Sequence, residues 1–264
     1  MASFQPRRCR DHARGARPRA RVPEPNACAR RRVLQTGSRV SAEPRIVHED
    51  EWLAVVEKPA CLVVHSAPGH RGETLVDALG DLLGGGDDPQ RPGIVHRLDK
   101  DTSGLMLVAR GEEAHRRLAA QIKAREVRRT YVALVEGRPR SRAGTIDAPL
   151  GRDYRAPARR AVGGRGPRAA RTHFMVLETL PADALVEARL ETGRTHQIRA
   201  HFAAIGHPLA GDPQYGHPGR HGLTRQFLHS ARLGFTHPFT DDEMEFSSAL
   251  PDDLAQALEV ARAG

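Results

Sequence analysis

The sequence predicts an α+β fold in which a mixed, largely antiparallel sheet carries a few flanking helices. Strand-like apolar runs outnumber segments with helical periodicity, and several of them follow one another closely enough to pair as hairpins. A chain of 264 residues is long enough to bury a core without disulfides. Because aromatic residues make up only 4% of the chain, we expect that core to consist mostly of Leu, Val, Ile and Ala.

The net charge of +9 is concentrated at the N-terminus. Residues 1–40 contain eleven of the 41 basic residues and two of the 32 acidic ones, so residues 41–264 carry 30 of each. A basic protein suggests a nucleic-acid partner, but here the part expected to fold is neutral overall. A surface that binds RNA or DNA must therefore arise from local clusters of Lys and Arg.

Residues 1–44 are rich in Arg, Pro and Ala and lack apolar periodicity, so we predict a disordered leader ahead of a folded domain at 45–264. The leader is either a basic arm that attracts phosphates or a dispensable, incorrectly assigned start. A mitochondrial-type leader fits less well, because the stretch is poor in Ser and broken by Pro.

The three cysteines, Cys9, Cys28 and Cys61, show no CxxC spacing, so neither a zinc site nor a disulfide framework is indicated. No apolar run is long enough to cross a bilayer, and the N-terminus lacks the apolar centre of a secretory signal. We therefore expect a cytoplasmic monomer without a membrane partner.

The first half of the domain alternates strands and helices. Strands are predicted at Arg45–His48, Trp52–Glu57 and Cys61–His65. Thr74, with Asp77 three residues later, predicts the start of a helix, and residues 84–89 form a flexible loop. A largely polar stretch of nine residues, 96–104, then separates apolar Gly93–Val95 from a buried strand at Leu105–Ala109. A helix from Glu112 follows, with Ala114, Leu118 and Ile122 on its apolar face.

In the second half, strands are predicted at Thr130–Val135, Thr172–Leu177, Ala184–Leu190, Phe227–Phe235 and Met244–Phe246, with a last helix from Pro251. Residues 151–170 have the composition of an exposed basic loop that could meet phosphates. Thr195 is predicted to cap a short helix with Ile198, Phe202 and Ile205 on its apolar face and Gly206 at its end. Arg199 lies beside that apolar stripe, so it needs an anionic partner.

Asp99 and Asp101, in the polar stretch, allow three interpretations. They could bind Mg²⁺ for phosphoryl chemistry, which predicts inhibition by EDTA, although no further acids are evident nearby. They could only shape a turn with the residues that follow. Alternatively, Asp99 is a nucleophile or acid/base group kept ionised by an arginine such as Arg97 or Arg199.

The stretch Gly93–Leu105 (GIVHRLDKDTSGL) resembles the signature of the RluA-type family of RNA pseudouridine synthases. The resemblance covers about residues 45–250, and the further matching segments occur in the family's order. These segments are Val55–Pro59, Thr130–Val135, Ile146–Arg152, Gly193–His201 and Gly206–Asp212. One such motif would be weak evidence for the family, but several motifs in the family's order are specific to it.

The resemblance implies a pseudouridine synthase catalytic fold at 45–264, with an RNA-binding cleft across a long mixed sheet. Asp99 matches the family's catalytic aspartate, which acts as nucleophile, and Arg199 matches the arginine that pairs with it. Tyr131 matches the tyrosine that packs on the target base and is suited to proton transfer; otherwise it is an ordinary strand aromatic. Whether Asp99 attacks C1′ or assists a glycal route stays open.

The target uridine must leave its stack to reach a carboxylate in a cleft. By resemblance, Arg97 fills the vacated stack, although a phosphate contact or a salt bridge with Asp101 is also open. Leu209 forms an apolar wall against the base, or is simply core. The remaining residues expected to bind substrate lie within the matched segments. They are His96, Arg194, His196 and Gln197.

The resemblance implies structured RNA, either rRNA or tRNA, as the partner, and no cofactor. No metal site is predicted, because no carboxylate or Cys completes a ligand set with the histidines between residues 196 and 229. These are His196, His201, His207, His217, His221 and His229. The competing class is an RNA-binding protein that kept the fold and lost the chemistry. The intact set of Asp99, Tyr131 and Arg199 argues against that class.

Two departures from the family concern the substrate rather than the chemistry. Residues 1–44 do not look like the small S4-type RNA-binding domain that often precedes the catalytic one. Arg129-Thr130 stands where a lysine is common ahead of Tyr131, and residues 157–170 are richer in Arg and Gly than usual.

Overall fold

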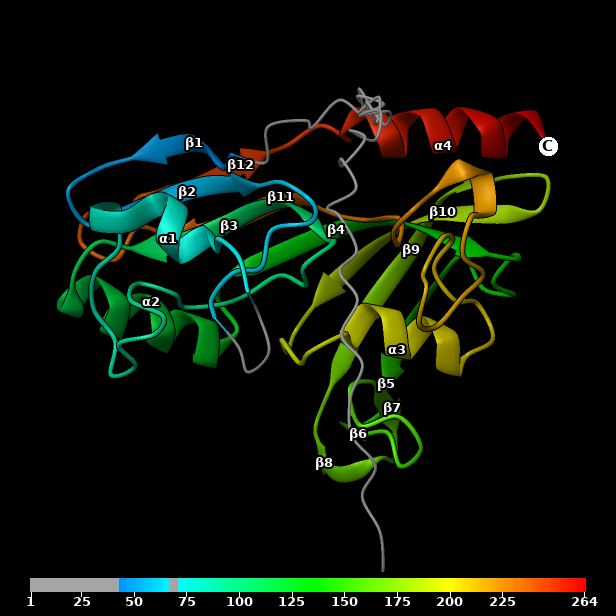
Figure 1. The fold of residues 1–264 in the computed structure, drawn as a ribbon, viewed down its shortest axis with the longest axis horizontal. Helices are drawn as coiled ribbons and strands as arrows, with labels where there is room; N and C mark the ends of the chain where they lie inside the picture. Colours follow the sequence, from blue (N-terminus) through cyan, green and yellow to red (C-terminus); the bar gives the residue numbers. More distant parts are fainter. Residues whose placement is uncertain (1–42, 67–70) are drawn as a thin grey trace, which may run out of the picture. The chain divides into compact units, whose positions relative to one another are not determined.

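One large sheet forms the frame of the fold (Figure 1). The structure, a computed structural model, describes residues 43–66 and 71–264, so the leader expected at 1–44 lies outside the described residues except for its last two. The described part contains a nine-stranded sheet in the order β1-β2-β3-β11-β4-β10-β9-β5, with β12 paired to β11. Its strands are β1 (Arg45–Glu49), β2 (Leu53–Lys58), β3 (Ser103–Ala109), β4 (Arg128–Glu136), β5 (Ala143–Asp147), β9 (Arg171–Thr179), β10 (Asp183–Leu190), β11 (Leu228–Thr236) and β12 (Glu243–Ser247).

The sheet is mixed and largely antiparallel. Strands β3 and β11 pair in parallel, at His229 opposite Ser103 and Ser230 opposite Gly104, whereas the other described pairs of this sheet are antiparallel. The predicted α+β class is therefore confirmed. Because β3 and β11 are central, the polar stretch that leads into β3 reaches the middle of the sheet rather than its edge.

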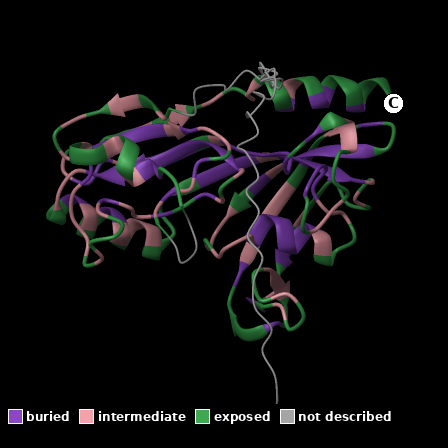
Figure 2. Cartoon of the chain, viewed as in Figure 1, coloured by how far each residue is buried: buried purple, intermediate pink, exposed green. Residues whose placement is uncertain are grey.

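Helices cover both faces of the sheet. The helices are α1 (Leu75–Leu79), α2 (Glu112–Ala124), α3 (Gln197–Ala204) and α4 (Asp252–Ala263). One face packs with α1 and α3 in a cluster that includes Val56, Met106, Ala133 and Phe202. On the opposite face, α2 packs on β2 and β3, and α4 packs on β4 and β10. Figure 1 shows α3 and α4 on opposite sides of the sheet, and Figure 2 shows the buried strands between them.

Local sequence signals account for α1 and α2. The Thr74 hydroxyl accepts a hydrogen bond from the Asp77 backbone while the Asp77 carboxylate accepts from the Thr74 backbone, which is the predicted capping box. The predicted stripe of α2 faces the sheet, with Ala114 and Leu118 buried. None of the helices in the described residues is long and apolar enough to cross a membrane.

A second, three-stranded sheet replaces the basic loop that was expected at 151–170. Strand β6 (Leu150–Arg152) pairs with β7 (Arg160–Val162) and with β8 (Arg165–Arg168). A Cβ at Gly151 would lie 2.2 Å from the carbonyl oxygen of Gly164, so the close strand approach depends on glycine there. The expectation of an irregular loop was wrong because glycine, which usually indicates a loop, here permits pairing; the side chains are still mostly exposed.

Two strand assignments differ from the sequence-based expectation. Residues 61–65 do not form a strand: Cys61 has a φ of 67°, and Val63 makes only an isolated bridge with Thr74. Their apolar run reflects burial of Leu62 and Val64 in the core rather than strand pairing. Strand β5 was not anticipated, because Ile146 is the one buried side chain in its short polar run.

Helix α3 begins later than its expected cap. His196, not Thr195, is the N-cap residue; it has a left-handed φ of 55° and no side-chain cap bond. Thr195 was the wrong choice because it lies one residue before this turn, too early to reach the first free amides of the helix. Ile205 lies past the helix end and is exposed, whereas Ile198 and Phe202 are buried as expected.

Candidate active site

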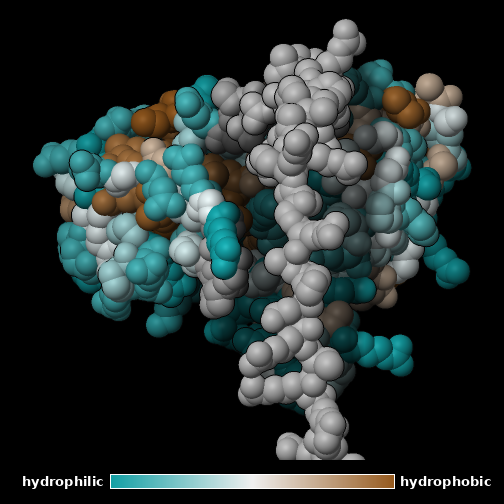
Figure 3. Space-filling model, viewed as in Figure 1, coloured by the Kyte–Doolittle hydropathy of each residue, from teal (hydrophilic) through white to brown (hydrophobic). Residues whose placement is uncertain are grey.

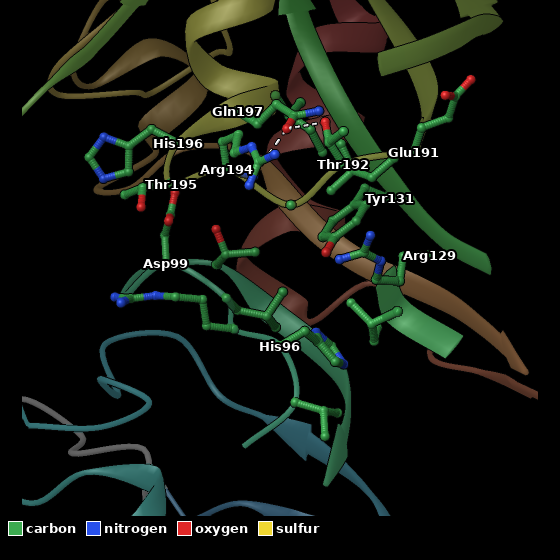
Figure 4. A pocket seen from close by; sticks show the side chains of 18 of the residues that line it. His96, Asp99, Arg129, Tyr131, Glu191, Thr192, Arg194, Thr195, His196 and Gln197 are labelled. Atoms are coloured by element: carbon green, nitrogen blue, oxygen red, sulfur yellow. Dashed lines mark hydrogen bonds between the residues drawn. The ribbon is translucent and has the colours of Figure 1, made fainter. Parts of the chain in front are cut away.

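A cavity of about 540 Å³ opens on the sheet face that carries α3. Its walls come from the polar stretch before β3, from β4, and from the segment that joins β10 to α3. Three residues singled out in the sequence, Asp99, Tyr131 and Arg199, line it together. Figure 4 shows Asp99 and Tyr131 in this cavity. The fold thus brings together groups from segments far apart in the sequence.

Arg199 joins two carboxylates at the floor of this cavity. Its Nε donates to Asp212 Oδ2 at 2.7 Å and its Nη2 donates to Asp212 Oδ1 at 2.9 Å, so Asp212 is held bidentately. Its Nη1 donates to Asp99 Oδ2 at 3.2 Å. Asp99 Oδ1 has no hydrogen-bond partner among the described residues, so one carboxylate oxygen of Asp99 is left for a ligand.

The ion pair between Arg199 and Asp212 is almost fully buried. Arg199 is 4% exposed and Asp212 is fully buried. Burial alone would lower the pKa of Arg199, but the carboxylates of Asp212 and Asp99 outweigh it and raise that pKa above its ordinary value. The Tyr215 ring lies 5.1 Å from the guanidinium carbon and adds a cation–π contact. Arg199 therefore remains charged and fixed in direction.

The turn that carries Asp99 is fixed from below by two basic side chains. Lys58 Nζ, at the end of β2, donates to the carbonyl oxygens of Pro59, Leu62 and Lys100 at 2.6, 2.9 and 2.9 Å. Arg225 Nη1 donates to the Asp101 carbonyl at 3.0 Å. These contacts hold the backbone carbonyls of the two residues that follow Asp99, so the core fixes the turn from which its carboxylate projects.

The end of the same turn is joined to β11. Gln226 Nε2 donates to Thr102 Oγ1 at 3.2 Å, and Ser103 Oγ lies 3.0 Å from His229 Nδ1. Gly104 has a φ of 111°, and a Cβ there would lie 2.3 Å from the Ser230 carbonyl oxygen. The glycine after the polar stretch is thus required for the parallel approach of β3 to β11.

Tyr131 lies in β4 and is buried at the cavity wall. Burial raises the pKa of its phenol, Asp99 raises it further, and the Arg129 guanidinium opposes this shift. The phenol is therefore protonated at neutral pH. Figure 4 shows Tyr131 between Asp99 and Arg129, with its ring beside the open space.

Arg97 and His96, which flank the turn, differ in environment. Arg97 is exposed at the cavity rim, with Nη1 3.3 Å from His65 Nε2. His96 is buried, and its Nε2 accepts a hydrogen bond from the Leu107 amide at 3.0 Å. Burial lowers the pKa of His96 to about 3, so its ring is neutral and carries its proton on Nδ1. His96 lines the cavity and also ties the turn to β3.

The other residues expected to bind substrate are divided between cavity and core. Arg194 lines the cavity, and its Nε donates to the Ala169 carbonyl. His196 lines it too, with Nδ1 3.1 Å from the Tyr215 hydroxyl. The Gln197 amide is fully engaged with Thr192, Arg194, Arg171 and Thr172. Leu209 is completely buried in the core and is not among the cavity-lining residues, which matches the core alternative.

Sequence reasoning assigned no role to Asp212, Tyr215 or Arg129, although all three lie at the site. Asp212 is the last residue of the matched segment Gly206–Asp212, so the motif itself could have identified it as a candidate site residue. Arg129 stands two residues before Tyr131, and the period of two along a strand places both on one face. In the described residues, no group of three or more His, Cys, Asp or Glu side chains is arranged to hold a metal ion.

Comparison with known proteins identifies related sequences. The family described as RNA pseudouridylate synthase matches residues 52–204. An uncharacterized RNA pseudouridine synthase of Chloroflexus aurantiacus is 53% identical over 76% of this chain and 64% of its own length. The uncharacterized RNA pseudouridine synthase YlyB of Bacillus subtilis is 46% identical over 91% of this chain and 78% of its own length. The ribosomal large subunit pseudouridine synthase D of Zymomonas mobilis is 47% identical over 79% of this chain and 70% of its own length.

Two solved human structures share the fold. The RNA pseudouridylate synthase domain containing 4 protein superposes with a TM-score of 0.66 at 24% identity, covering 83% of this chain and 93% of that one. The domain containing 1 protein superposes with a TM-score of 0.64 at 26% identity, covering 84% and 96%. The fold expected from the resemblance is therefore confirmed.

Proposed function

The chain belongs to the RNA pseudouridylate synthase family, and from this premise we propose that it isomerises specific uridines of structured RNA to pseudouridine. One observation carries the proposal. Asp99 presents a carboxylate to the cavity, with one oxygen bound by a buried arginine and the other free of protein partners. A carboxylate held in this way is suited to act on a sugar carbon or on the base.

The chemistry requires two events at the target nucleotide. The bond between N1 and C1′ breaks and a bond between C5 and C1′ forms, after which the proton on C5 must leave. Asp99 is the nucleophile that handles the first event, and Arg199 keeps its carboxylate oriented and charge-balanced. Since both a C1′ adduct and a glycal route begin with this carboxylate, the assignment of Asp99 does not depend on the route.

Tyr131 supplies the surface on which the base packs. Its ring lies at the cavity wall beside the Asp99 turn, where a planar base can rest against it (Figure 4). Its hydroxyl is the group on this wall that can exchange a proton with the base. Because its pKa is raised, Tyr131 enters the reaction protonated. It can give this proton to N1 of the detached base and, as the resulting phenolate, take up the proton that leaves C5.

The target uridine reaches Asp99 by leaving its stack. Arg97 is an exposed side chain at the rim that can enter the vacated space. Its guanidinium is planar, and its one hydrogen bond to a described side chain is the 3.3 Å contact with His65. We assign it to this role.

The substrate is rRNA or tRNA, and the names of relatives favour rRNA of the large subunit. Three relatives that are 45–47% identical to this chain carry the name ribosomal large subunit pseudouridine synthase D. The exposed arginines of β6–β8 give the chain a surface for the phosphates of such a large RNA.

Tritium release from RNA labelled at C5 of uridine tests the proposal, because the C5 proton is lost only when the new bond forms. We expect release by the wild type from unmodified large-subunit rRNA. Asp99→Asn should reduce the rate by at least about a thousandfold, as for other catalytic nucleophiles. Mapping of carbodiimide-dependent primer stops then names the uridine.

Asp101→Asn is the matched control, because it makes the same chemical change two residues away in the same turn and should retain most activity. RNA binding without any release by the wild type would instead indicate the RNA-binding class. Release that survives Asp99→Asn would refute the role of Asp99.

A further inference from the structure

We propose that Arg129 forms a subsite for a backbone phosphate of the RNA next to the target nucleotide. This inference rests on the proposed function, because it takes the cavity to receive RNA. It adds a binding contact that is separate from the pair of Asp99 and Arg199.

Arg129 is a buried cation without a counter-ion. It is 5% exposed, yet it forms no ion pair with any of the described residues, and its Nε is buried without a hydrogen-bond partner. The two other comparably buried arginines are both paired, Arg199 with Asp212 at 2.7 Å and Arg225 with Asp253 at 2.6 Å. A buried charge without a partner is costly, so an anion from outside the chain accounts for Arg129.

The terminal nitrogens of Arg129 lie at the cavity wall. Arg129 lines the cavity and shares a face of β4 with Tyr131, the residue against which the base is expected to pack. Gly193 flanks it, since a Cβ there would lie 2.8 Å from Arg129 Nη1. Because residue 193 is a glycine, the Arg129 guanidinium has room to lie at the cavity wall.

The neighbouring groups do not neutralise Arg129. Glu191 lines the same cavity, but it already binds His173 at 2.6 Å, Arg125 at 2.7 Å and Arg171 at 3.3 Å. His96 is neutral, and Arg129 helps to keep it so. Among the described residues, no acid at this end of the cavity is left to pair with Arg129.

Further cations surround the same end. Arg168 and Arg194 line the cavity, and neither forms an ion pair with any described residue. Burial lowers the pKa of Arg194, and the nearby charges of Arg168 and Arg125 lower it further. Crowded like charges of this kind favour an incoming anion.

A phosphate is the anion that the substrate brings here. A nucleotide that is extruded into the cavity carries its flanking phosphates with it, whereas its uracil base is uncharged. A guanidinium binds two phosphate oxygens at once, which an ammonium cannot do with the same geometry. Arg129 is therefore suited to bidentate phosphate binding.

Ethylation interference tests the inference on the full-length protein. An unmodified large-subunit rRNA transcript is ethylated at random phosphates, bound to the protein, and mapped for ethylations absent from the bound fraction. For the wild type we expect interference at a phosphate within about two nucleotides of the target uridine. In Arg129→Gln, ethylation of that one phosphate should no longer reduce binding. The slope of log affinity against log salt should become shallower by about 0.7.

Arg128→Gln is the matched control. Arg128 is adjacent on β4, carries the same charge, faces the opposite side of the sheet and is paired with Glu243 at 3.1 Å. It should keep the wild-type interference pattern. Gly193→Ala should lose the same site as Arg129→Gln without any change in charge, because its methyl group displaces Nη1.

An Arg129→Gln variant that unfolds at the wild-type temperature and keeps both the interference pattern and the salt slope would overturn the inference. So would a variant that loses only the rate of tritium release while its affinity is unchanged. Interference is measured on binding alone. If the wild type binds RNA but releases no tritium, the proposed function fails. The phosphate contact can still be tested, because it is the ethylation site whose interference is lost in Arg129→Gln.

Discussion

At the scale of residues, Asp212 and His96 explain how the turn that carries Asp99 keeps its geometry. Asp212 occupies Nε and Nη2 of Arg199, which leaves Nη1 to face Asp99. His96 accepts from the backbone of β3 and stays neutral. Neither residue is expected to touch the reacting atoms, so both act by placing others.

Asp212→Asn should destabilise the protein by about 3–5 kcal/mol, because it leaves the buried charge of Arg199 with only one carboxylate. It should also slow tritium release, since Arg199 is then free to turn away from Asp99. Urea unfolding and the release assay measure the two effects. Asp147→Asn breaks an arginine–carboxylate pair of 2.6 Å whose Asp147 side chain is 57% exposed, and should cost less than about 1 kcal/mol. Equal unfolding midpoints for the two variants would contradict this expectation.

His96 should make stability depend on pH below neutrality. The unfolded chain takes up a proton as the pH falls through 6.5, whereas folded His96 stays neutral down to about 3. Its contribution to stability is therefore complete above pH 6.5 and is lost progressively as the pH falls toward 3. Between pH 7 and pH 5 the wild type should lose about 2 kcal/mol more than His96→Asn does. Urea titrations at the two pH values test this, and parallel losses in both proteins would refute it.

At the scale of elements, the site is made where the end of β2, the turn before β3 and the start of β11 meet. The Lys58 side chain crosses from β2 to the turn, and Gln226 and His229 hold its far end. Apolar residues on both sides are buried in the clusters that α1, α2 and α3 complete. The conformation of the polar stretch is therefore set by its contacts with side chains of neighbouring elements, not by the residues of the stretch alone.

Lys58→Met keeps the length of the side chain but removes its donors. It leaves the carbonyls of Pro59, Leu62 and Lys100 without this donor, which should cost about 1–3 kcal/mol and loosen the Asp99 turn. We expect a lower melting temperature together with slower tritium release. Lys100→Met, at an exposed neighbour, should change neither. A Lys58→Met variant with wild-type activity would show that the turn does not depend on this side chain.

At the scale of the whole molecule, charge is organised locally although the domain is neutral. Residues 150–168 hold six arginines and one acid, and none of these arginines forms an ion pair with a described residue. They lie on the small sheet β6–β8, which Figure 3 shows as a hydrophilic region in the lower part of the view. This sheet and the cavity rim are both suited to phosphates of one large RNA.

The triple variant Arg152→Ala, Arg155→Ala and Arg165→Ala should weaken RNA binding and make its salt dependence shallower by about 2 in log–log slope, because up to three phosphate contacts are lost. Titrations of large-subunit rRNA at several salt concentrations measure the slope. Arg45→Ala, Arg116→Ala and Arg262→Ala together remove the same charge from arginines that already have acidic partners. This control should leave the slope nearly unchanged; an equal effect of both triples would indicate a diffuse charge effect.

The sequence by itself determined the parts of this protein that depend on neighbouring residues. Periodicity predicted β2, β3, β4, α2 and α4, and the spacing of Thr74 and Asp77 predicted the cap of α1. The matched motifs predicted that Asp99, Tyr131 and Arg199 would meet, as they do at one cavity. The strands, helices and cap are local patterns that burial of one face is enough to enforce, whereas the meeting of the three residues was predicted through the resemblance to the family.

Only the tertiary structure decided which distant groups pair. Arg199 was known to need an anion, but its principal partner, Asp212, and the missing partner of Arg129 follow from packing across the sheet. Similarly, residues 151–170 read as a loop because glycine and arginine carry no strand signal, yet they pair once their neighbours approach. In each case the contacting groups lie on different strands, helices or loops, so the periodicity of a single element does not record the contact. The Asp99–Arg199 contact is the extreme example, because it joins residues 100 positions apart.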